Sequence, residues 1–238
     1  LVAKLKQRKL LEEITNVEIL LYGSLAKTGK GHGTDIAVLL GLSNEDPETI
    51  DVNTIETKVA AIKQSERLQL GGMVSVPFVY HRHLQFLVTE FLPFHPNAVT
   101  FLLTTISGQH ISETYYSIGG GFVVQEQEAT PVDAGTVVLP FPINTAAELQ
   151  HWCLKTGLSV WEVVLENEIA WRSETATRQQ VRYIWETMKA CIYRGCHTSG
   201  QLPGGLQVKR RAAELNKRLL PTAEYAHFNE WMMAIRAG

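Results

Sequence analysis

The first part of the chain alternates short apolar runs with segments of helical periodicity. Residues 17–24 (VEILLYGS) are a compact apolar run that predicts a buried strand. Residues 34–42 (TDIAVLLGL) predict a helix with Thr34 or Asp35 as its N-cap. Residues 47–68 predict another short helix. This mixture indicates an α+β region.

Further strands are expected before residue 120. Residues 74–80 predict a strand, and Pro77 favours an edge position because proline cannot donate to a neighbouring strand. Residues 98–106 and 109–118 are strand-like runs on either side of a Ser-Gly pair. Glycine supplies the positive φ of a tight turn, so the two runs predict a β-hairpin.

The pattern becomes purely helical near residue 144. Capping boxes, in which Ser or Thr is followed three residues later by Glu, predict helix starts at Thr145 and Ser159. Residues 177–195 form an amphipathic stripe that predicts a long helix ending at Gly195. No strand is expected after about residue 142.

Two prolines interrupt the pattern in residues 139–145 (LPFPINT) and predict a domain boundary. The fold class expected is therefore an α+β domain, with a mixed sheet and helices, over residues 1–143. The beginning of an all-α domain follows over residues 144–238. Helical patterns run up to both ends of the sequence, so we expect a fragment of a longer protein.

Composition narrows the classes of function. The 238 residues are 45% hydrophobic, with a formal net charge of −2. That charge gives no reason to expect nucleic acid or an anionic membrane as a partner, and no apolar run is long enough for a membrane span. The cysteines Cys153, Cys191 and Cys196 have no CxxC spacing and predict reduced thiols in a cytoplasmic protein.

The most unusual stretch is residues 23–35 (GSLAKTGKGHGTD). Five residues separate Gly23 from Gly29, so the stretch does not fit a P-loop, and it does not fit GxGxxG either. Three interpretations stay open: a flexible strand-to-helix turn, an anion site at a helix N-terminus, or a catalytic histidine. Glycines flank both Lys30 and His32, which would let a ligand approach the backbone closely.

The order of several motifs resembles the iron–sulfur-dependent L-serine dehydratases of bacteria, also called L-serine ammonia-lyases. The matching stretches are residues 22–42, 92–99 (LPFHPNAV), 114–123 (TYYSIGGGFV), 167–170 (NEIA) and 202–212 (LPGGLQVKRRA). Five matches in order are far more specific than any one of them.

The resemblance implies a lyase that removes water from L-serine and releases pyruvate and ammonia. It implies a [4Fe-4S] cluster whose open iron acts as a Lewis acid on the serine hydroxyl, and no pyridoxal phosphate. In the family the cluster cysteines come from a C-terminal helical region, and a serine-rich stretch ending in histidine precedes Leu1. The resemblance therefore places no metal ligand in this chain, and the fragment alone is expected to be inactive.

The resemblance also assigns roles to residues of the glycine-rich stretch. His32 is the candidate base for the α-proton of serine, and Lys30 would steer the substrate carboxylate. Gly31, Gly33 and Thr34 are the other candidate substrate-binding residues. Further candidates near the site are Ser117, Gly119, Gly120, Asn167 and Glu168. The glycines of YSIGGG also fit a bulge or a tight corner.

Two other classes of function stay open beside the enzyme. The α+β domain resembles the serine-binding regulatory module of some phosphoglycerate dehydrogenases, so it could sense serine without a catalytic role. A pyridoxal-phosphate dehydratase would reach the same products, but it needs a Schiff-base lysine and a phosphate cup. The partners expected are L-serine and a second copy of the chain in a homodimer.

Overall fold

The computed structural model describes residues 1–126, 137–202 and 206–219. Two compact units divide the chain: Leu1–Val132 with Pro203–Gln207, and Asp133–Leu202 with Val208–Gly238. We call them the first and the second unit. A mixed sheet with helices followed by a helical region confirms the α+β domain and the helices after it. The boundary expected near residue 143 stays a prediction.

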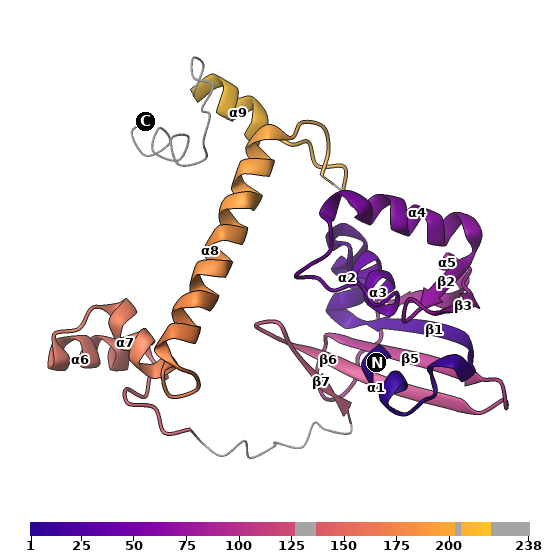
Figure 1. The fold of residues 1–238 in the computed structure, drawn as a ribbon, viewed down its shortest axis with the longest axis horizontal. Coiled ribbons are helices and arrows are strands. Elements are labelled where there is room, and N and C mark those ends of the chain that lie inside the picture. Colours follow the sequence, from indigo (N-terminus) through magenta and orange to yellow (C-terminus); the bar gives the residue numbers. More distant parts are fainter. Residues whose placement is uncertain (127–136, 203–205, 220–238) are drawn as a thin grey trace. The chain divides into compact units, whose positions relative to one another are not determined.

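A five-stranded sheet forms the centre of the first unit, in the order β4-β1-β5-β6-β7 (Figure 1). Only β4 runs parallel to its neighbour β1, and the other pairs are antiparallel. The strands are β1 (Ile14–Tyr22), β4 (Leu84–Leu87), β5 (Ala98–Thr105), β6 (His110–Gly119) and β7 (Phe122–Gln125). The expected hairpin is confirmed, with β5 and β6 joined at Ser107-Gly108.

The buried strand predicted over residues 17–24 is β1. Its alternate residues Val17, Ile19 and Leu21 are fully buried, as the two-residue period of a strand requires. A second sheet pairs β2 (Arg67–Leu70) with β3 (Val74–Pro77). Pro77 is the last residue of β3, and both strands of a two-stranded sheet are edge strands, as predicted for Pro77. β3 is three residues shorter than the strand predicted over residues 74–80.

Three helices, α2, α3 and α4, lie on one side of the five-stranded sheet (Figure 1). The helical elements of the first unit are α1 (Val2–Gln7), η1 (Leu11–Glu13), α2 (Gly23–His32), α3 (Thr34–Leu42), η2 (Val52–Thr54), α4 (Ile55–Ser65) and α5 (Tyr80–His83). The helices predicted over residues 34–42 and within 47–68 are confirmed as α3 and α4.

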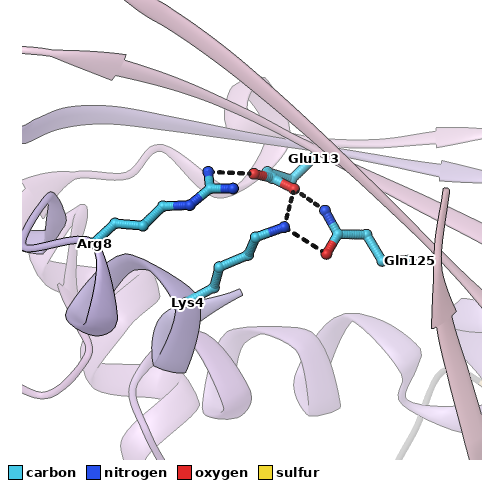
Figure 2. A network of polar contacts seen from close by, with 4 residues as sticks. All are labelled: Lys4, Arg8, Glu113 and Gln125. Atoms are coloured by element: carbon cyan, nitrogen blue, oxygen red, sulfur yellow. Dashed lines mark hydrogen bonds and ion pairs between the residues drawn. The ribbon is translucent and has the colours of Figure 1, made fainter. Parts of the chain in front are cut away.

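A buried carboxylate ties α1 to the outer strands, as Figure 2 shows. The side chain of Glu113 on β6 is only 5% exposed, and it pairs with Lys4 Nζ at 3.5 Å and Arg8 Nη1 at 3.2 Å. Gln125 on β7 donates its amide to the same carboxylate and accepts from Lys4 Nζ at 2.7 Å. A buried charge is costly unless it is paired and hydrogen-bonded, and these donors meet that cost.

The second unit is helical, with α6 (Ala146–Thr156), α7 (Val160–Glu168), α8 (Glu174–His197) and α9 (Ala212–Leu219). Both predicted capping boxes are present, at Thr145 and Ser159. The helix end predicted at Gly195 is wrong, because α8 runs through to its C-cap Thr198. An isolated bridge pairs Gln201 with Lys209, in a region where no strand was expected. No helix in the described ranges is long and apolar enough to cross a membrane.

We expect Glu113→Ala to lower the free energy of unfolding of the first unit by about 2–3 kcal/mol, because it leaves Arg8 and the buried Gln125 amide without their acceptor. Urea denaturation followed by far-UV circular dichroism measures the effect. All five tryptophans follow residue 151, so their fluorescence reports on the second unit and should not shift. Glu12→Ala, at an exposed position of η1, is the matched control and should stay within about 0.5 kcal/mol.

Candidate functional site

The glycine-rich stretch is not a turn. Residues Gly23–His32 form α2, so the interpretation of a flexible strand-to-helix loop is wrong. The helix starts directly after β1 and packs against β1, β4 and β5. Packing against the sheet therefore overrides the low helix propensity of glycine here.

The inner face of α2 carries almost no side chains. Gly23, Ala26 and Gly29 are its buried residues, three positions apart and so on one face. A Cβ at Gly29 would lie 2.9 Å from Cε1 of Phe86 on β4. At Gly23, where φ is +49°, a Cβ would lie 2.2 Å from the carbonyl oxygen of Pro96. Gly29 therefore serves close packing of the helix on β4, and Gly23 serves close packing on the segment before β5.

A single residue, Gly33, joins α2 to α3. It has φ 72° and ψ 28°, the left-handed conformation that favours glycine, and it is both C-cap of α2 and N-cap of α3. Its N–H bonds to the Gly29 carbonyl, and its own carbonyl accepts from the Ala37 N–H at 2.9 Å. The expected cap at Thr34 or Asp35 is wrong, because no side chain caps α3. We call Gly33 the α2–α3 junction.

His32 is the last residue of α2 and is exposed. Its Nδ1 lies 3.1 Å from the carbonyl oxygen of Thr28, one turn earlier. A carbonyl oxygen can only accept, so Nδ1 carries the proton in this contact. In the neutral ring Nε2 is then the acceptor nitrogen, which is the form that a base requires.

Lys30 leaves α2 in a different direction. Its Nζ lies 5.3 Å from the centre of the Phe86 ring, a cation–π contact. Residues two positions apart on a helix do not face one another, so Lys30 and His32 do not share a side of α2.

A cavity of about 610 Å³ opens beside the junction. Gly31, His32 and Gly33 form one wall, so the structure brings three of the predicted residues together. Much of the remaining wall is apolar: Ile36, Ala37, Leu40, Pro47, Ile50, Val52 and Ile55. The carboxylates at this cavity are those of Glu45 and Asp46, and Glu45 is paired with Lys58.

Asp35 accepts a buried hydrogen bond that its position at a helix start did not predict. Its side chain is buried, 6% exposed as a residue, and Oδ2 accepts a hydrogen bond from the hydroxyl of Tyr80 on α5. Burial, followed by this hydrogen bond and the Asp35 charge, raises the pKa of Tyr80 above its ordinary value. No pattern in the sequence indicated this pair, whose members are 45 positions apart.

The candidates of the YSIGGG motif lie at the turn between β6 and β7. The pairing of β6 with β7 shifts register between Ser117 and Gly119, which is the bulge that the glycines suggested. Gly119 and Gly120 have φ of +99° and +61°. Among the described contacts none joins this turn to His32 or Lys30.

Asn167 and Glu168 belong to α7 of the second unit. Asn167 is buried and binds the backbone of Phe141 twice, accepting from its N–H at 2.9 Å and donating to its carbonyl at 2.7 Å. Glu168 pairs with Arg172 at 3.6 Å and lines a separate cavity of about 670 Å³ with Trp161 and Trp185. Asn167 therefore has a structural role, because its side chain holds the backbone of Phe141.

The described residues do not gather a metal-binding set. Cys153, Cys191 and Cys196 are free thiols, and burial raises the pKa of the Cys196 thiol, which disfavours a thiolate ligand. No group of three His, Cys, Asp or Glu side chains in the described ranges is placed to hold a metal ion. These residues do not fit a [4Fe-4S] cluster.

Comparison with known proteins gives two matches in order along the chain. Residues 1–128 match the family "Serine dehydratase beta chain", and residues 155–237 match "Serine dehydratase alpha chain". L-serine dehydratase of Streptomyces coelicolor is 41% identical over 219 residues, which is 91% of this chain and 48% of that protein. L-serine dehydratase 2 of Escherichia coli is 39% identical over 216 residues, 90% of this chain and 47% of that protein. The chain spans about half the length of these curated relatives.

The packing role of Gly29 can be tested against a second helical glycine. We expect Gly29→Ala to lower the free energy of unfolding of the first unit by about 1–3 kcal/mol, because its Cβ overlaps the Phe86 ring. Gly41→Ala in α3 meets nothing within 4 Å and should be neutral or stabilising by up to about 1 kcal/mol. Urea denaturation by circular dichroism measures both, and equal effects would contradict the packing argument.

Proposed function

The chain belongs to the serine dehydratase family, and on that premise we propose that it takes part in converting L-serine to pyruvate and ammonia. One observation carries the proposal: the beta-chain and alpha-chain families match consecutive parts of one chain. The relatives that match across both parts are named L-serine dehydratases, which supports the same substrate here.

The reaction is an elimination followed by hydrolysis. A base takes the proton from Cα of L-serine, and the hydroxyl group leaves C3 as water after gaining a proton. The product, 2-aminoacrylate, tautomerises to an imine, and water hydrolyses the imine to pyruvate and ammonia. No electron acceptor is needed, because the reaction causes no net oxidation or reduction.

We assign the base to Nε2 of His32. The Nδ1 contact with the Thr28 carbonyl favours the tautomer in which Nε2 is unprotonated, and the ring is exposed at the cavity beside the junction. An imidazole is suited to this role because its ordinary pKa lies close to neutrality.

The start of α3 supports binding of the substrate carboxylate. The first amides of a helix have no partner within it, and the helix dipole favours an anion there. Gly31, Gly33 and Thr34 surround this point, and the cavity reaches Gly31 and Gly33. Lys30 would add an attractive field on the path of the substrate. Ser117, Gly119, Gly120, Asn167 and Glu168 stay predictions as residues near the site.

We also propose a [4Fe-4S] cluster, and not pyridoxal phosphate, for the complete enzyme. The support is the family resemblance alone. Since the described residues do not fit a cluster, its ligand cysteines would lie elsewhere, and no step assigned to His32 runs through it. A homodimer in the cytoplasm belongs to the same proposal.

A serine-sensing role of the first unit is the second candidate. The observation in its favour is that the hydrogen bond of His32 stays within α2, whereas a catalytic histidine is commonly oriented by a carboxylate. A sensor needs the carboxylate site at α3 but no base. The two roles differ in what happens to turnover when His32 is removed.

We expect His32→Ala to lower kcat of the full-length protein at least ~100-fold, the usual scale for loss of a positioned acid–base group. Steady-state pyruvate formation under anaerobic conditions measures it. His110→Ala, at an exposed position of β6, is the control and should leave kcat within about twofold. A fall of less than tenfold in His32→Ala would favour the sensor and remove His32 from the chemistry.

The visible spectrum of the full-length protein distinguishes the cofactors. We expect a broad iron–sulfur absorption that bleaches in air, because exposed clusters are oxidised by oxygen. A sharp band that borohydride removes would instead indicate a pyridoxal Schiff base and would end the iron–sulfur proposal. The measurement is independent of activity.

A further inference from the structure

A buried hydrogen bond lies immediately beyond the junction. Asp35 is the second residue of α3, and it is far more buried than a carboxylate at a helix start needs to be. Asp and Glu are almost never fully buried unless they have a partner. In the described part of the chain, the hydroxyl of Tyr80 is the hydrogen-bond donor to its side chain.

Other contacts fix Tyr80 in turn. It begins α5, whose neighbouring Phe78 is fully buried and whose His83 accepts the Val79 N–H on Nδ1 at 2.7 Å. Nζ of Lys63, on α4, lies 4.0 Å from the centre of the Tyr80 ring. α5 packs against β1 and β4. The hydroxyl is therefore presented to Asp35 from a segment anchored on the sheet.

The first turn of α3 is one residue away from His32. One residue separates the two helices, and Gly33 has a left-handed conformation that both helix ends share. A shift of the first turn of α3 cannot be absorbed by a flexible loop, because none exists between Thr34 and His32. It passes through Gly33 to the last turn of α2.

We propose that Asp35 and Tyr80 are positioning residues for His32: their hydrogen bond anchors the first turn of α3 to α5 and so fixes the imidazole at the junction. This inference rests on the proposed role of His32 as the base. Neither residue touches the substrate in it. They act only through the place that the junction gives to Nε2, and small misplacements of a reacting group are costly in rate.

A double-mutant cycle tests the proposal in the full-length protein. The proteins compared are unsubstituted, His32→Ala, Tyr80→Phe and the double variant, assayed by steady-state pyruvate formation. Tyr80→Phe keeps the ring and its contact with Lys63 and removes only the hydroxyl. We expect it to lower kcat about tenfold, with a smaller change in KM, and to cause no further fall when His32 is already alanine.

A control variant and two variants of Asp35 distinguish a loss of positioning of His32 from a general loss of activity. Tyr115→Phe removes another tyrosine hydroxyl, on β6, and should leave kcat within about twofold. Asp35→Asn keeps an acceptor for the Tyr80 hydroxyl and should stay within about threefold, whereas Asp35→Ala should resemble Tyr80→Phe. Circular dichroism checks that each variant is folded.

Each adverse outcome is distinct. If His32→Ala falls at least a hundredfold but the effects of the two substitutions multiply, the base stands and the positioning inference is overturned. The inference is also overturned if Tyr80→Phe stays within twofold, or if Asp35→Asn is as poor as Asp35→Ala. If His32→Ala itself falls less than tenfold, the assignment of the base to His32 fails and the inference fails with it.

Discussion

The close approach of α2 to the sheet is the constraint on which the candidate site depends. Gly23, Ala26 and Gly29 leave the inner face of the helix nearly flat, and the Phe86 ring fills the space that a larger side chain at Gly29 would take. The end of α2 therefore reaches a fixed place above the sheet. Gly33 then joins α2 to α3 without a loop, and the cavity opens beside it. In the sequence, Gly23 and Gly29 suggest a loop that binds a ligand. In the structure, they let α2 pack closely and so determine where the helix ends.

The sequence predicted what local interactions decide. Alternating apolar residues, the Ser-Gly turn and the two capping boxes each fix an element through neighbours in the sequence, and the structure confirms them. α2 could not be predicted in this way, since each glycine costs a helix about 1 kcal/mol relative to alanine. Its compensating contacts come from Phe86 and Pro96, which are far away in the sequence. The wrong helix end at Gly195 has the converse cause. Glycine ends a helix where the chain turns left-handed, and α8 continues instead to Thr198, whose φ is −112°.

Residues nominated by a motif divide into those explained by packing and those still without a structural reason. The side-chain amide of Asn167 holds both backbone groups of Phe141, so its place in a motif follows from local architecture. Gly119 and Gly120 follow from the positive φ of a hairpin. His32 is different, because an exposed ring at a helix end contributes little packing. That contrast supports the chemistry proposed at His32, beside the Nδ1 contact and the cavity. The sequence could nominate His32 as a candidate base. It could not nominate the positioning residues Asp35 and Tyr80, because Tyr80 lies on another element, far away in the sequence.

The junction also has an electrostatic consequence. Carbonyl groups at the end of α2 favour a positive charge on His32, while the amides at the start of α3 favour a negative charge next to it. The transfer of a proton from Cα of serine to His32 would create an imidazolium ion beside a carboxylate and a developing carbanion. Both helix ends therefore favour the products of that step over its reactants. Each contributes only about 0.3–1 kcal/mol at an exposed position, whereas a positioned base is worth roughly 10²–10⁴ in rate. The helix ends can tune the base, but the placement of Nε2 has to supply the larger share, and that placement depends on the packing of α2 and on the bond between Asp35 and Tyr80.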